Sequence, residues 1–499
     1  MIHFHVNTEI GRLRKVLIHS PNSGLGKIVP SKAQEWLFED IVHVPRIQRE
    51  EYDYFIKTLL YFLDPDKVRG KLAEIDDPKN QRAFYKPTKP GFHNSEHVLD
   101  IHRLIADVLA DREVRLQLVA AVCAIEGIST RMKSQLLALE PALLANTLIT
   151  GSLPDKTMIF HPLANLIFTR DIGIVINDHL LLNKPAKLAR TREALLAKYM
   201  FFSHPYFESR RQNIIELYED EHYFLLSDKE RERITVTLEG GDVMMVAPNH
   251  LFIGISERTS AYAVNQVIQR LFERNVVEKV SVIRIPAKRE FMHIDTVFTQ
   301  VARDCWVLFG GLSAKQKQTE QYVVRTLLDE PVYDPLTIHQ FERGFNEPKR
   351  FDYLEDLLED LSKTDLGVAG DVHFVYSGGD EFPYAEREQW TDSCNLLVLK
   401  EGVAIGYDRN DETMKAFGRA GYRCIPARDL LAAFEAGTEN PDTIEQTIIL
   451  LPSAELSRAR GGSHCRSMPL LRDSLSAPRP CAPATPVSPL VDQKMAAHS

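Results

Sequence analysis

The sequence predicts an α/β fold, because one strand–strand–helix–strand unit recurs along the chain. One copy has two apolar strands around a turn at residues 248–249, a helix through Val264 and Leu271 and a third strand, at 243–246, 251–255 and 280–285. The same order is expected at residues 396–399, 403–405, 411–420 and 422–425. Further strand pairs begin near Ile172 and Val297, so with an N-terminal strand at 16–18 there are five related starts. Repetition on this scale indicates a radial or pseudo-symmetric arrangement of strands.

A helical region interrupts the strands near the N-terminus. From Trp36 to Leu148 apolar residues recur at helical spacing, and one face behind a cap at Asn94 or Ser95 carries Val98, Ile101, Ile105, Val108 and Leu109. The Pro- and Lys-rich residues 85–91 are expected to form a loop. The length of the chain permits one large domain with an insertion or two domains. The simpler expectation is that the helices of about residues 92–150 are an insertion into one domain of residues 1–472.

The end of the chain has a different composition. Residues 473–499 are rich in Pro, Ser and other small or polar residues. Such a segment cannot bury enough apolar surface to fold, so we expect a disordered tail.

Composition and charge argue against several classes of protein. The chain of 499 residues is 44% hydrophobic and 26% charged, which is ordinary for a soluble globular protein. Its formal charge is −9 and it has no dense Lys/Arg stripe, so we expect no nucleic-acid partner. The N-terminus lacks the pattern of a signal peptide, and no apolar stretch is long enough to span a bilayer. We therefore expect a cytoplasmic protein without membrane contact, for which a homo-oligomer is permitted.

The six cysteines are spread along the chain without a Cys-x-x-Cys pair. This spacing argues against a disulfide framework and against a structural zinc site. Cys123, Cys305 and Cys424 lie among apolar residues, where a buried and inert thiol is expected.

Cys465 is the candidate nucleophile. It follows two glycines and a histidine, with Arg458 and Arg460 just upstream. Because cationic neighbours lower the pKa of a thiol, we expect part of Cys465 to be thiolate before a substrate binds. Cys394 is the weaker candidate, because a strand follows it directly and no cation adjoins it.

Two carboxylates lie in short polar islands next to apolar strands. Asp171 follows Arg170 just before a strand, and the simpler interpretation of these neighbours is a structural ion pair. Glu239 precedes the pair Gly240-Gly241, where a backbone can approach a ligand closely. The glycines fit neither a dinucleotide nor a Walker pattern, so they do not predict a phosphate site.

A third carboxylate is paired with a histidine. His293 and Asp295 are two residues apart, so in an extended segment both side chains face one cavity. A metal site would use the same residue types, but a second histidine at ligand spacing is missing, and no metal or other cofactor is expected.

Together the islands supply a thiol, a histidine and three carboxylates. Acids that converge without a metal repel one another and raise their own pKa values unless a cation lies among them. A guanidinium is always charged, and its planar fork of donors matches paired carboxylates. We therefore expect the substrate to supply the missing positive charge.

Five motifs, in order along the chain, resemble those of the arginine deiminases within the superfamily of guanidino-group modifying enzymes. They are Asn-x-x-Phe-Thr-Arg-Asp at 165–171, Glu-Gly-Gly-Asp at 239–242, Ile-Gly-x-Ser-x-Arg-Thr at 253–259, His-x-Asp-Thr at 293–296 and Arg-Gly-Gly-x-x-Cys at 460–465. The segments 7–13 and 37–40 are similar as well, so the resemblance extends from about residue 5 to about residue 472.

The resemblance implies a fold and an activity. The fold would be a pentein, with five ββαβ units around a pseudo-fivefold axis and a helical insertion. The activity would be hydrolysis of free L-arginine to L-citrulline and ammonia, the first step of arginine degradation, through an S-alkylthiouronium intermediate on Cys465 and without a cofactor.

The resemblance also implies roles for individual residues. Cys465 would be the nucleophile, His293 the general acid and base, and Glu239 the carboxylate partner of His293. Asp171 and Asp295 would hold the guanidinium. Arg190 and Arg258 would bind the substrate carboxylate, and Asn165 would assist at the amino-acid end. Phe168 would pack against the aliphatic stem. Arg460 would be a gate that pairs with the carboxylates of the site when no substrate is bound.

The chain departs from the family pattern at two places and leaves other functions open. Ile172-Gly173 stands where Pro-Phe is common, and Arg466 follows Cys465 where methionine is usual. A basic residue at 466 could lower the pKa of Cys465 further or crowd the site. The alternatives are hydrolysis of agmatine or methylated arginines, amidino transfer, a regulator that binds arginine without turnover, and a metal-dependent amidohydrolase.

Overall fold

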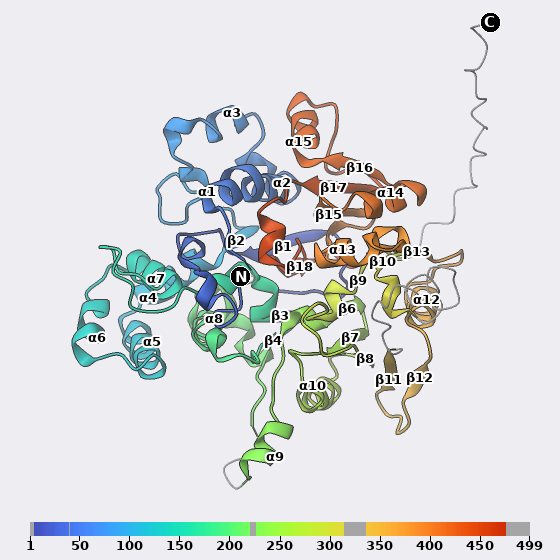
Figure 1. The fold of residues 1–499 in the computed structure, drawn as a ribbon, viewed down its shortest axis with the longest axis horizontal. Helices are drawn as coiled ribbons and strands as arrows, with labels where there is room; N and C mark the ends of the chain where they lie inside the picture. Colours follow the sequence, from blue (N-terminus) through green and yellow to red (C-terminus); the bar gives the residue numbers. More distant parts are fainter. Residues whose placement is uncertain (1–3, 39, 220–225, 314–335, 476–499) are drawn as a thin grey trace, which may run out of the picture.

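The computed structural model describes residues 4–38, 40–219, 226–313 and 336–475 (Figure 1). It confirms the α/β class. The strands are β1 (Leu13–Ile18), β2 (Val98–Asp100), β3 (Gly173–Ile176), β4 (His179–Leu182), β5 (Ile214–Ile215), β6 (Val243–Ala247), β7 (His250–Ile255), β8 (Lys279–Arg284), β9 (Phe298–Ala302), β10 (Cys305–Leu308), β11 (Thr337–Glu342), β12 (Lys349–Phe351), β13 (His373–Tyr376), β14 (Leu397–Lys400), β15 (Val403–Tyr407), β16 (Arg423–Pro426), β17 (Thr447–Leu451) and β18 (Met468–Arg472).

The α-helices lie between and beside these strands. They are α1 (Val44–Arg46), α2 (Asp53–Leu63), α3 (Leu72–Ile75), α4 (Ile101–Ala110), α5 (Arg112–Ile125), α6 (Thr130–Leu137), α7 (Pro141–Thr150), α8 (Thr191–Ser203), α9 (Asp228–Arg233), α10 (Ala261–Glu273), α12 (Leu354–Thr364), α13 (Tyr384–Trp390), α14 (Asp411–Arg419) and α15 (Ala427–Ala436). Within the described ranges, no helix has the length and apolar character that a membrane span requires.

The described strands form five sheets that share one connectivity. In each sheet the second strand of an antiparallel pair also pairs in parallel with a strand that follows a helix. The antiparallel pairs are β18–β1, β3–β4, β6–β7, β9–β10 and β14–β15, and their parallel additions are β2, β5, β8, β13 and β17. This is the strand–strand–helix–strand unit that the sequence predicts, with the first unit split between the two ends of the chain. In the copy that begins at residue 396, the strand expected at 422–425 is β16, which lies at the sheet edge, while β17 takes the place next to β15.

The helical region differs from the prediction at its start. Val98 pairs with Val16 in parallel, so residues 98–100 belong to a strand and the helix begins only at Ile101. The side chain of Asp100 accepts the backbone N–H of His102 at 2.9 Å and caps the helix. The predicted cap at Asn94 or Ser95 is therefore wrong, because pairing with β1 removes residues 98–100 from the helix.

The predicted domain boundaries remain predictions. Helices α4 to α7 fill much of residues 101–150 and pack into the same core as β3 and β4. The expected loop at 85–91 is found as a series of turns after residue 85. From residue 476 onward, the predicted tail lies outside the described residues.

Several candidate site residues lie where the first strand of a sheet begins. One-turn 3-10 helices precede β3, β6 and β9, namely η8 (Thr169–Ile172), η12 (Gly240–Asp242) and η13 (Ile294–Thr296), and η12 contacts both of the others. The segment before β18 carries Cys465, and the segment before β14 carries Asn395. The shared connectivity thus presents five short segments, one from each sheet.

Candidate active site

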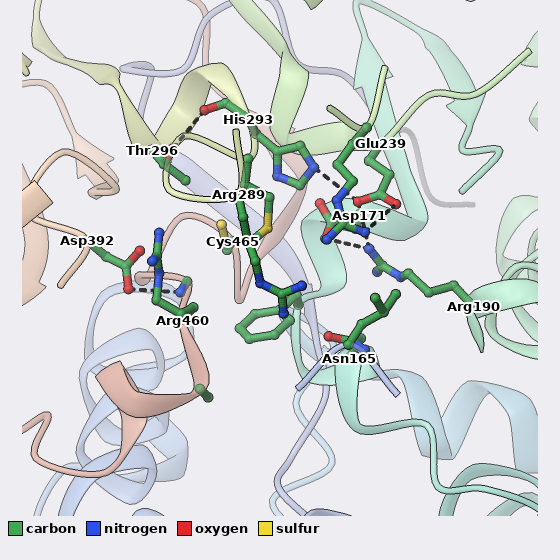
Figure 2. A pocket seen from close by; sticks show the side chains of 16 residues that line it. Asn165, Asp171, Arg190, Glu239, Arg289, His293, Thr296, Asp392, Arg460 and Cys465 are labelled. Atoms are coloured by element: carbon green, nitrogen blue, oxygen red, sulfur yellow. Dashed lines mark hydrogen bonds and ion pairs between the residues drawn. The ribbon is translucent and has the colours of Figure 1, made fainter. Parts of the chain in front are cut away.

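One pocket collects the predicted site residues (Figure 2). Nine of the ten line it, and the tenth, Asp295, contacts the Cys465 sulfur. All ten are buried. The pocket is lined by Leu37, Asn165, Phe168, Asp171, Arg190, Glu239, Arg258, Arg289, Met292, His293, Thr296, Asp392, Ala459, Arg460, Gly461 and Cys465.

Cys465 is fixed by backbone contacts on both sides. Its N–H donates to Asn395 Oδ1 at 3.0 Å, and its carbonyl accepts the N–H of Arg170 at 3.0 Å. The Asn395 amide also donates to the carbonyl of Asp295 at 3.0 Å. Asn395 therefore ties Cys465 to the segment that carries Asp295.

Asp295 lies between the thiol and a second histidine. Its Oδ2 is 3.4 Å from Cys465 Sγ and 2.8 Å from Nδ1 of His464. The other nitrogen of His464 is 3.5 Å from Glu9, which also binds Arg170 through two hydrogen bonds of 3.0 and 3.3 Å. Arg170 thus pairs with Glu9, and the predicted ion pair with its neighbour Asp171 is wrong.

His293 and Glu239 form a buried pair. His293 Nε2 is 3.0 Å from Glu239 Oε2. The glycine at 241 makes this approach possible, because a Cβ there would lie 2.5 Å from Nδ1 of His293. Asp242 accepts the N–H of Ile294 at 3.0 Å and holds the segment that follows the histidine. The Glu-Gly-Gly-Asp motif therefore supplies the partner, the space and the anchor for His293.

The charges of the site determine the protonation state of His293. Burial lowers the pKa of His293, but the charge of Asp171, the hydrogen bond with Glu239 and the charges of Asp242 and Glu239 outweigh burial and raise that pKa to about 10. At neutral pH His293 is therefore an imidazolium, which donates its Nε2 proton to Glu239.

The thiol is protonated in the same state. Burial raises the pKa of Cys465 well above its usual value, and the nearby charges of Asp295 and Asp171 raise it further. The prediction that arginines next to Cys465 in sequence lower its pKa is therefore wrong. Arg458 forms an exposed pair with Asp40, and the sulfur contacts a carboxylate.

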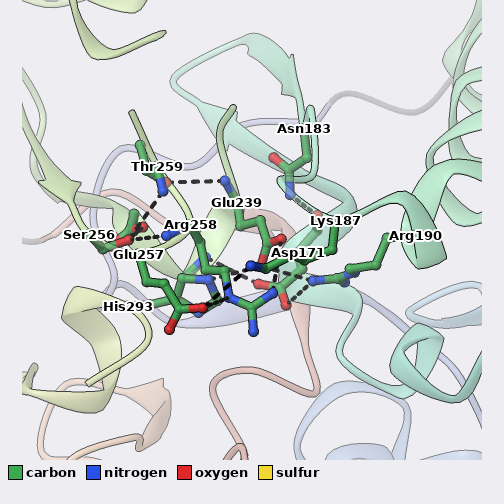
Figure 3. A network of polar contacts seen from close by, with 12 residues as sticks. Asp171, Asn183, Lys187, Arg190, Glu239, Ser256, Glu257, Arg258, Thr259 and His293 are labelled. Atoms are coloured by element: carbon green, nitrogen blue, oxygen red, sulfur yellow. Dashed lines mark hydrogen bonds and ion pairs between the residues drawn. The ribbon is translucent and has the colours of Figure 1, made fainter. Parts of the chain in front are cut away.

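Arg190 lies among the acids of the site (Figure 3). Its Nη1 is 2.9 Å from Asp171 Oδ2 and 3.0 Å from Glu239 Oε2, and its Nε is 3.1 Å from Glu193. Asp171 is held further by the N–H of Gly241, which donates to Oδ1 at 3.3 Å. An internal guanidinium therefore already partners two of the carboxylates that were expected to face a substrate.

Arg460 lies elsewhere in the pocket. Its guanidinium stacks on the ring of Trp390 at 3.7 Å, and Nη2 donates to the carbonyl of Glu290 at 3.0 Å. The pairing with site carboxylates that was expected of Arg460 is made in this structure by Arg190.

The remaining predicted residues form the rest of the wall. Arg258 Nη1 lies 4.0 Å from Glu239 Oε1. Asn165 donates to the carbonyl of Trp36 at 2.9 Å, which holds Leu37 at the pocket. Phe168 adds an aromatic face.

Three carboxylate oxygens in the site have no hydrogen-bond partner among the described residues. They are Glu239 Oε1, Asp295 Oδ1 and Asp392 Oδ1, and all three residues are buried. A buried acceptor without a donor is costly, and a planar cation with several N–H groups supplies donors that suit carboxylate oxygens.

A metal ion is the other cation to consider. Ligand atoms of Asp171, Glu239 and His293 lie within 4.8 Å of one another. Arg190 Nη1 already bridges the two carboxylates, and His293 is protonated at neutral pH, so these residues fit a metal ion poorly.

Sequence reasoning missed several residues of the site. Asp392 accepts the N–H of Gly461 at 2.8 Å, and Asn395 positions Cys465. Both flank Cys394, which is fully buried, does not line the pocket and has a pKa that burial raises to about 12. Their position before β14 matches that of Asp171 before β3, which is the feature that could have identified them.

The comparisons with known proteins agree with the motifs. The arginine deiminase family model matches residues 124–472. The arginine deiminase of Treponema denticola is 27% identical over 482 residues, which cover 94% of this chain and 99% of that protein. The arginine deiminase of Bacillus cereus is 29% identical over 494 residues, with 94% and 99% covered.

Solved structures give more distant matches. SxtG, an amidinotransferase from Microseira wollei in the saxitoxin biosynthetic pathway, is 13% identical with a TM-score of 0.44, and the match covers 95% of this chain and 99% of that one. A dimethylarginine dimethylaminohydrolase adduct with S-methyl-L-thiocitrulline is 16% identical with a TM-score of 0.34, covering 61% and 76%.

Proposed function

Because this chain belongs to the arginine deiminase family, we propose that it hydrolyses free L-arginine to L-citrulline and ammonia, with Cys465 as the nucleophile. The observation that carries the proposal is the set of unsatisfied carboxylate oxygens on Glu239 and Asp392, which line the pocket, and on Asp295, which contacts the Cys465 thiol. The same pocket holds the imidazolium of His293. This set of groups suits a guanidinium substrate.

Binding of the substrate prepares the nucleophile. Asp171, Glu239 and Asp295 hold the guanidinium so that its carbon faces Cys465 Sγ. The positive charge that arrives opposes the negative charges that keep the thiol protonated, so its pKa falls and its proton leaves to solvent. The enzyme thus forms its reactive thiolate only when a substrate is present.

Attack and loss of ammonia follow. The thiolate adds to the guanidinium carbon and forms a neutral tetrahedral adduct. The imidazolium of His293 donates its proton to the departing nitrogen, and the C–N bond breaks to release ammonia. The S-alkylthiouronium cation that remains is held by the same acids, and His293 is left neutral.

Hydrolysis reverses the proton transfer. Water adds to the thiouronium carbon while His293 takes one of its protons. The second adduct expels the thiolate as the citrulline carbonyl forms. The proton lost from its hydroxyl group combines with the released ammonia to give ammonium. Glu239, as the partner of His293 at 3.0 Å, favours the imidazolium that each cycle regenerates.

The substrate carboxylate decides between arginine and agmatine. Arg190 and Arg258 line the pocket, and we propose that they bind this carboxylate, with Asn165 at the amino-acid end and Phe168 against the stem. Arg190 then has to give up part of its contact with Asp171 and Glu239, whose charge the substrate guanidinium replaces. Agmatine has the guanidinium but no carboxylate. It can therefore replace the charge of Arg190 beside Asp171 and Glu239, but it offers Arg190 no carboxylate in return.

Expectations about the fold, the cellular compartment and the oligomeric state complete the proposal. The five sheets with one connectivity support a pentein arrangement around a pseudo-fivefold axis. The five described cysteines are unpaired, which suits a reducing cytoplasm and a first step of arginine degradation there. A homo-oligomer remains an expectation that sedimentation would check.

The direct experiment is an activity panel. Purified protein is incubated with arginine, agmatine, methylarginines and an amine acceptor, with and without a chelator, between pH 5 and 8. Citrulline from arginine in every chelator arm is the expected result. Absence of citrulline with an intact thiol would reject the proposal, and loss of activity with chelator would favour a metal-dependent amidohydrolase.

A further inference from the structure

Arg466 is buried directly after the nucleophile, and its side chain is committed to one loop. Its Nη2 donates to the carbonyl of Leu456 at 2.7 Å, and its Nη1 donates to the carbonyl of Gly461. These carbonyls are the first and last of residues 456–461, which we call the Arg460 loop. The arginine fork therefore joins the two ends of this loop.

Other buried groups hold the same loop. Gly461 accepts from the hydroxyl of Tyr407 at 2.9 Å and donates to Asp392 at 2.8 Å. At the other end, the N–H of Leu456 donates to Glu51 at 2.6 Å. The loop is thus fixed at both ends, and Arg466 is the group that bridges them.

The fixed loop includes a conformation that a non-glycine residue adopts only at a cost. Arg460 has φ of +56°, in the left-handed region, and Gly461 follows at +108°. Such a backbone persists only where its surroundings hold it. The hydrogen bonds at Gly461 supply that hold directly after Arg460.

Four pocket-lining residues depend on this arrangement. The loop carries Ala459, Gly461 and Arg460, whose guanidinium stacks on Trp390 at 3.7 Å. The Arg466 guanidinium also lies 5.4 Å from the ring of Phe168, and a Cβ on Gly461 would come within 2.7 Å of that ring. Displacing the loop would therefore move one wall of the pocket.

We propose that Arg466 is a positioning residue that fixes the Arg460 loop and, through Arg460 and Phe168, sets how tightly the pocket binds its guanidino substrate. This inference rests on the proposed function and deepens it. The fork geometry is the reason, because only a planar side chain with separated donors reaches two carbonyls at once while its face lies against two rings, those of Phe168 and Tyr407.

Two substitutions separate position from charge. Arg466→Met removes both donors and leaves an unbranched apolar side chain. Arg466→Lys keeps the charge but cannot bridge both carbonyls. We expect both to raise KM for arginine about tenfold, since hydrogen bonds from a charged group are lost, with kcat changed by less than about threefold. A residue that acted through its charge on Cys465 would instead leave the Lys variant close to wild type.

A spectroscopic readout reports the loop itself. The chain has three tryptophans. Trp306 is fully buried and Trp390 is 46% exposed, so in a Trp36→Phe background acrylamide quenching reports Trp390. We expect Arg466→Met to increase that quenching, because Arg460 leaves the face of the indole ring.

A matched variant separates the proposed positioning role of Arg466 from a general loss of stability. Arg472 is also a fully buried arginine that donates to two backbone carbonyls, those of Gly11 at 2.7 Å and Val398 at 2.8 Å, but it lies on β18 outside the loop. Arg472→Met is expected to lower the unfolding midpoint without changing Trp390 quenching. Should Arg466→Met fail to fold, Tyr407→Phe removes one hydroxyl from Gly461 and is expected to raise KM in the same direction.

The outcomes are distinct. Raised KM with increased Trp390 quenching in both Arg466 variants supports the proposal. Wild-type KM in Arg466→Met, or a Lys variant that equals wild type, overturns it. Wild-type protein that forms no citrulline at all would reject the proposed function, whatever the variants do to quenching.

Discussion

The buried charges around the imidazolium of His293 predict how the stability of the protein depends on pH. The pKa of His293 is about 10 in the folded protein, against an ordinary value of 6.5 for histidine. A group whose pKa is raised on folding contributes stability that is fully present below the unfolded pKa and is lost as pH rises through the folded one. The window for this loss is therefore pH 6.5 to about 10.

The magnitude follows from the size of the pKa difference. Each unit corresponds to about 1.4 kcal/mol, so the protonated histidine contributes on the order of 5 kcal/mol below pH 6.5 and about 4 kcal/mol at pH 7. By pH 10 nearly all of it is lost. The imidazole is fully buried, so solvent does not screen this contribution.

Urea unfolding measured from pH 7 to 10 on the wild type and on His293→Asn tests the reasoning. The free energy of unfolding of the wild type should fall about 3 to 4 kcal/mol more than that of the variant across this range. Other groups that titrate there are common to both proteins and cancel in the difference.

His250 provides the matched control. It is also buried and bonded to a carboxylate, with Nδ1 2.7 Å from Asp365, but burial lowers its pKa below the usual value. His250→Asn should therefore run parallel to the wild type above pH 7. Parallel curves for His293→Asn and the wild type would refute the charge assignment of the site.

Three further predictions concern the site. Asp295→Asn removes the charge beside the sulfur, so iodoacetamide should alkylate Cys465 faster at pH 8 while arginine turnover falls roughly a hundredfold; unchanged alkylation would contradict the assigned cause of the raised pKa. Arg190→Gln should weaken arginine binding by tenfold or more yet strengthen agmatine binding, because the acids lose their internal cation; calorimetry with both ligands checks this, and unchanged agmatine affinity would reject the exchange. Cys465→Ser should abolish citrulline formation while arginine still raises the thermal midpoint, and retained turnover would move the nucleophile away from residue 465.

Much of the site could be predicted because its polar side chains lie at one type of position, just before an apolar strand. Asp171, Glu239 and His293 each lie in a polar island before an apolar strand, and the structure brings these islands together at the start of the first strand of a sheet. Period-2 patterns fix where such strands begin, so the islands stand out in the sequence.

The partners of side chains could not be predicted in the same way. Arg458, Arg460 and Arg466 are all close to Cys465 in sequence, yet they contact Asp40, Trp390 and the loop carbonyls respectively. In an irregular loop the direction of each side chain depends on distant segments. The sign of the thiol pKa shift was wrong for that reason.

The remote contributors show the same limit. His464 is next to the nucleophile, but its role depends on Asp295 and Glu9, which lie 169 and 455 positions away in the chain. Asn395 follows Cys394, and in the sequence the thiol is the more obvious functional group of the two. Only the fold shows that the island before β14 joins the site through its amide.

The measurement that tests the account most directly is the mass of the protein during turnover. Wild-type enzyme is mixed with excess arginine, quenched in acid within the first turnovers and digested, and the peptide that contains Cys465 is weighed. The account predicts a transient gain equal to arginine minus ammonia on that peptide, absent from Cys465→Ser. Citrulline formation with no such adduct on Cys465, or with the adduct on Cys394, would contradict it.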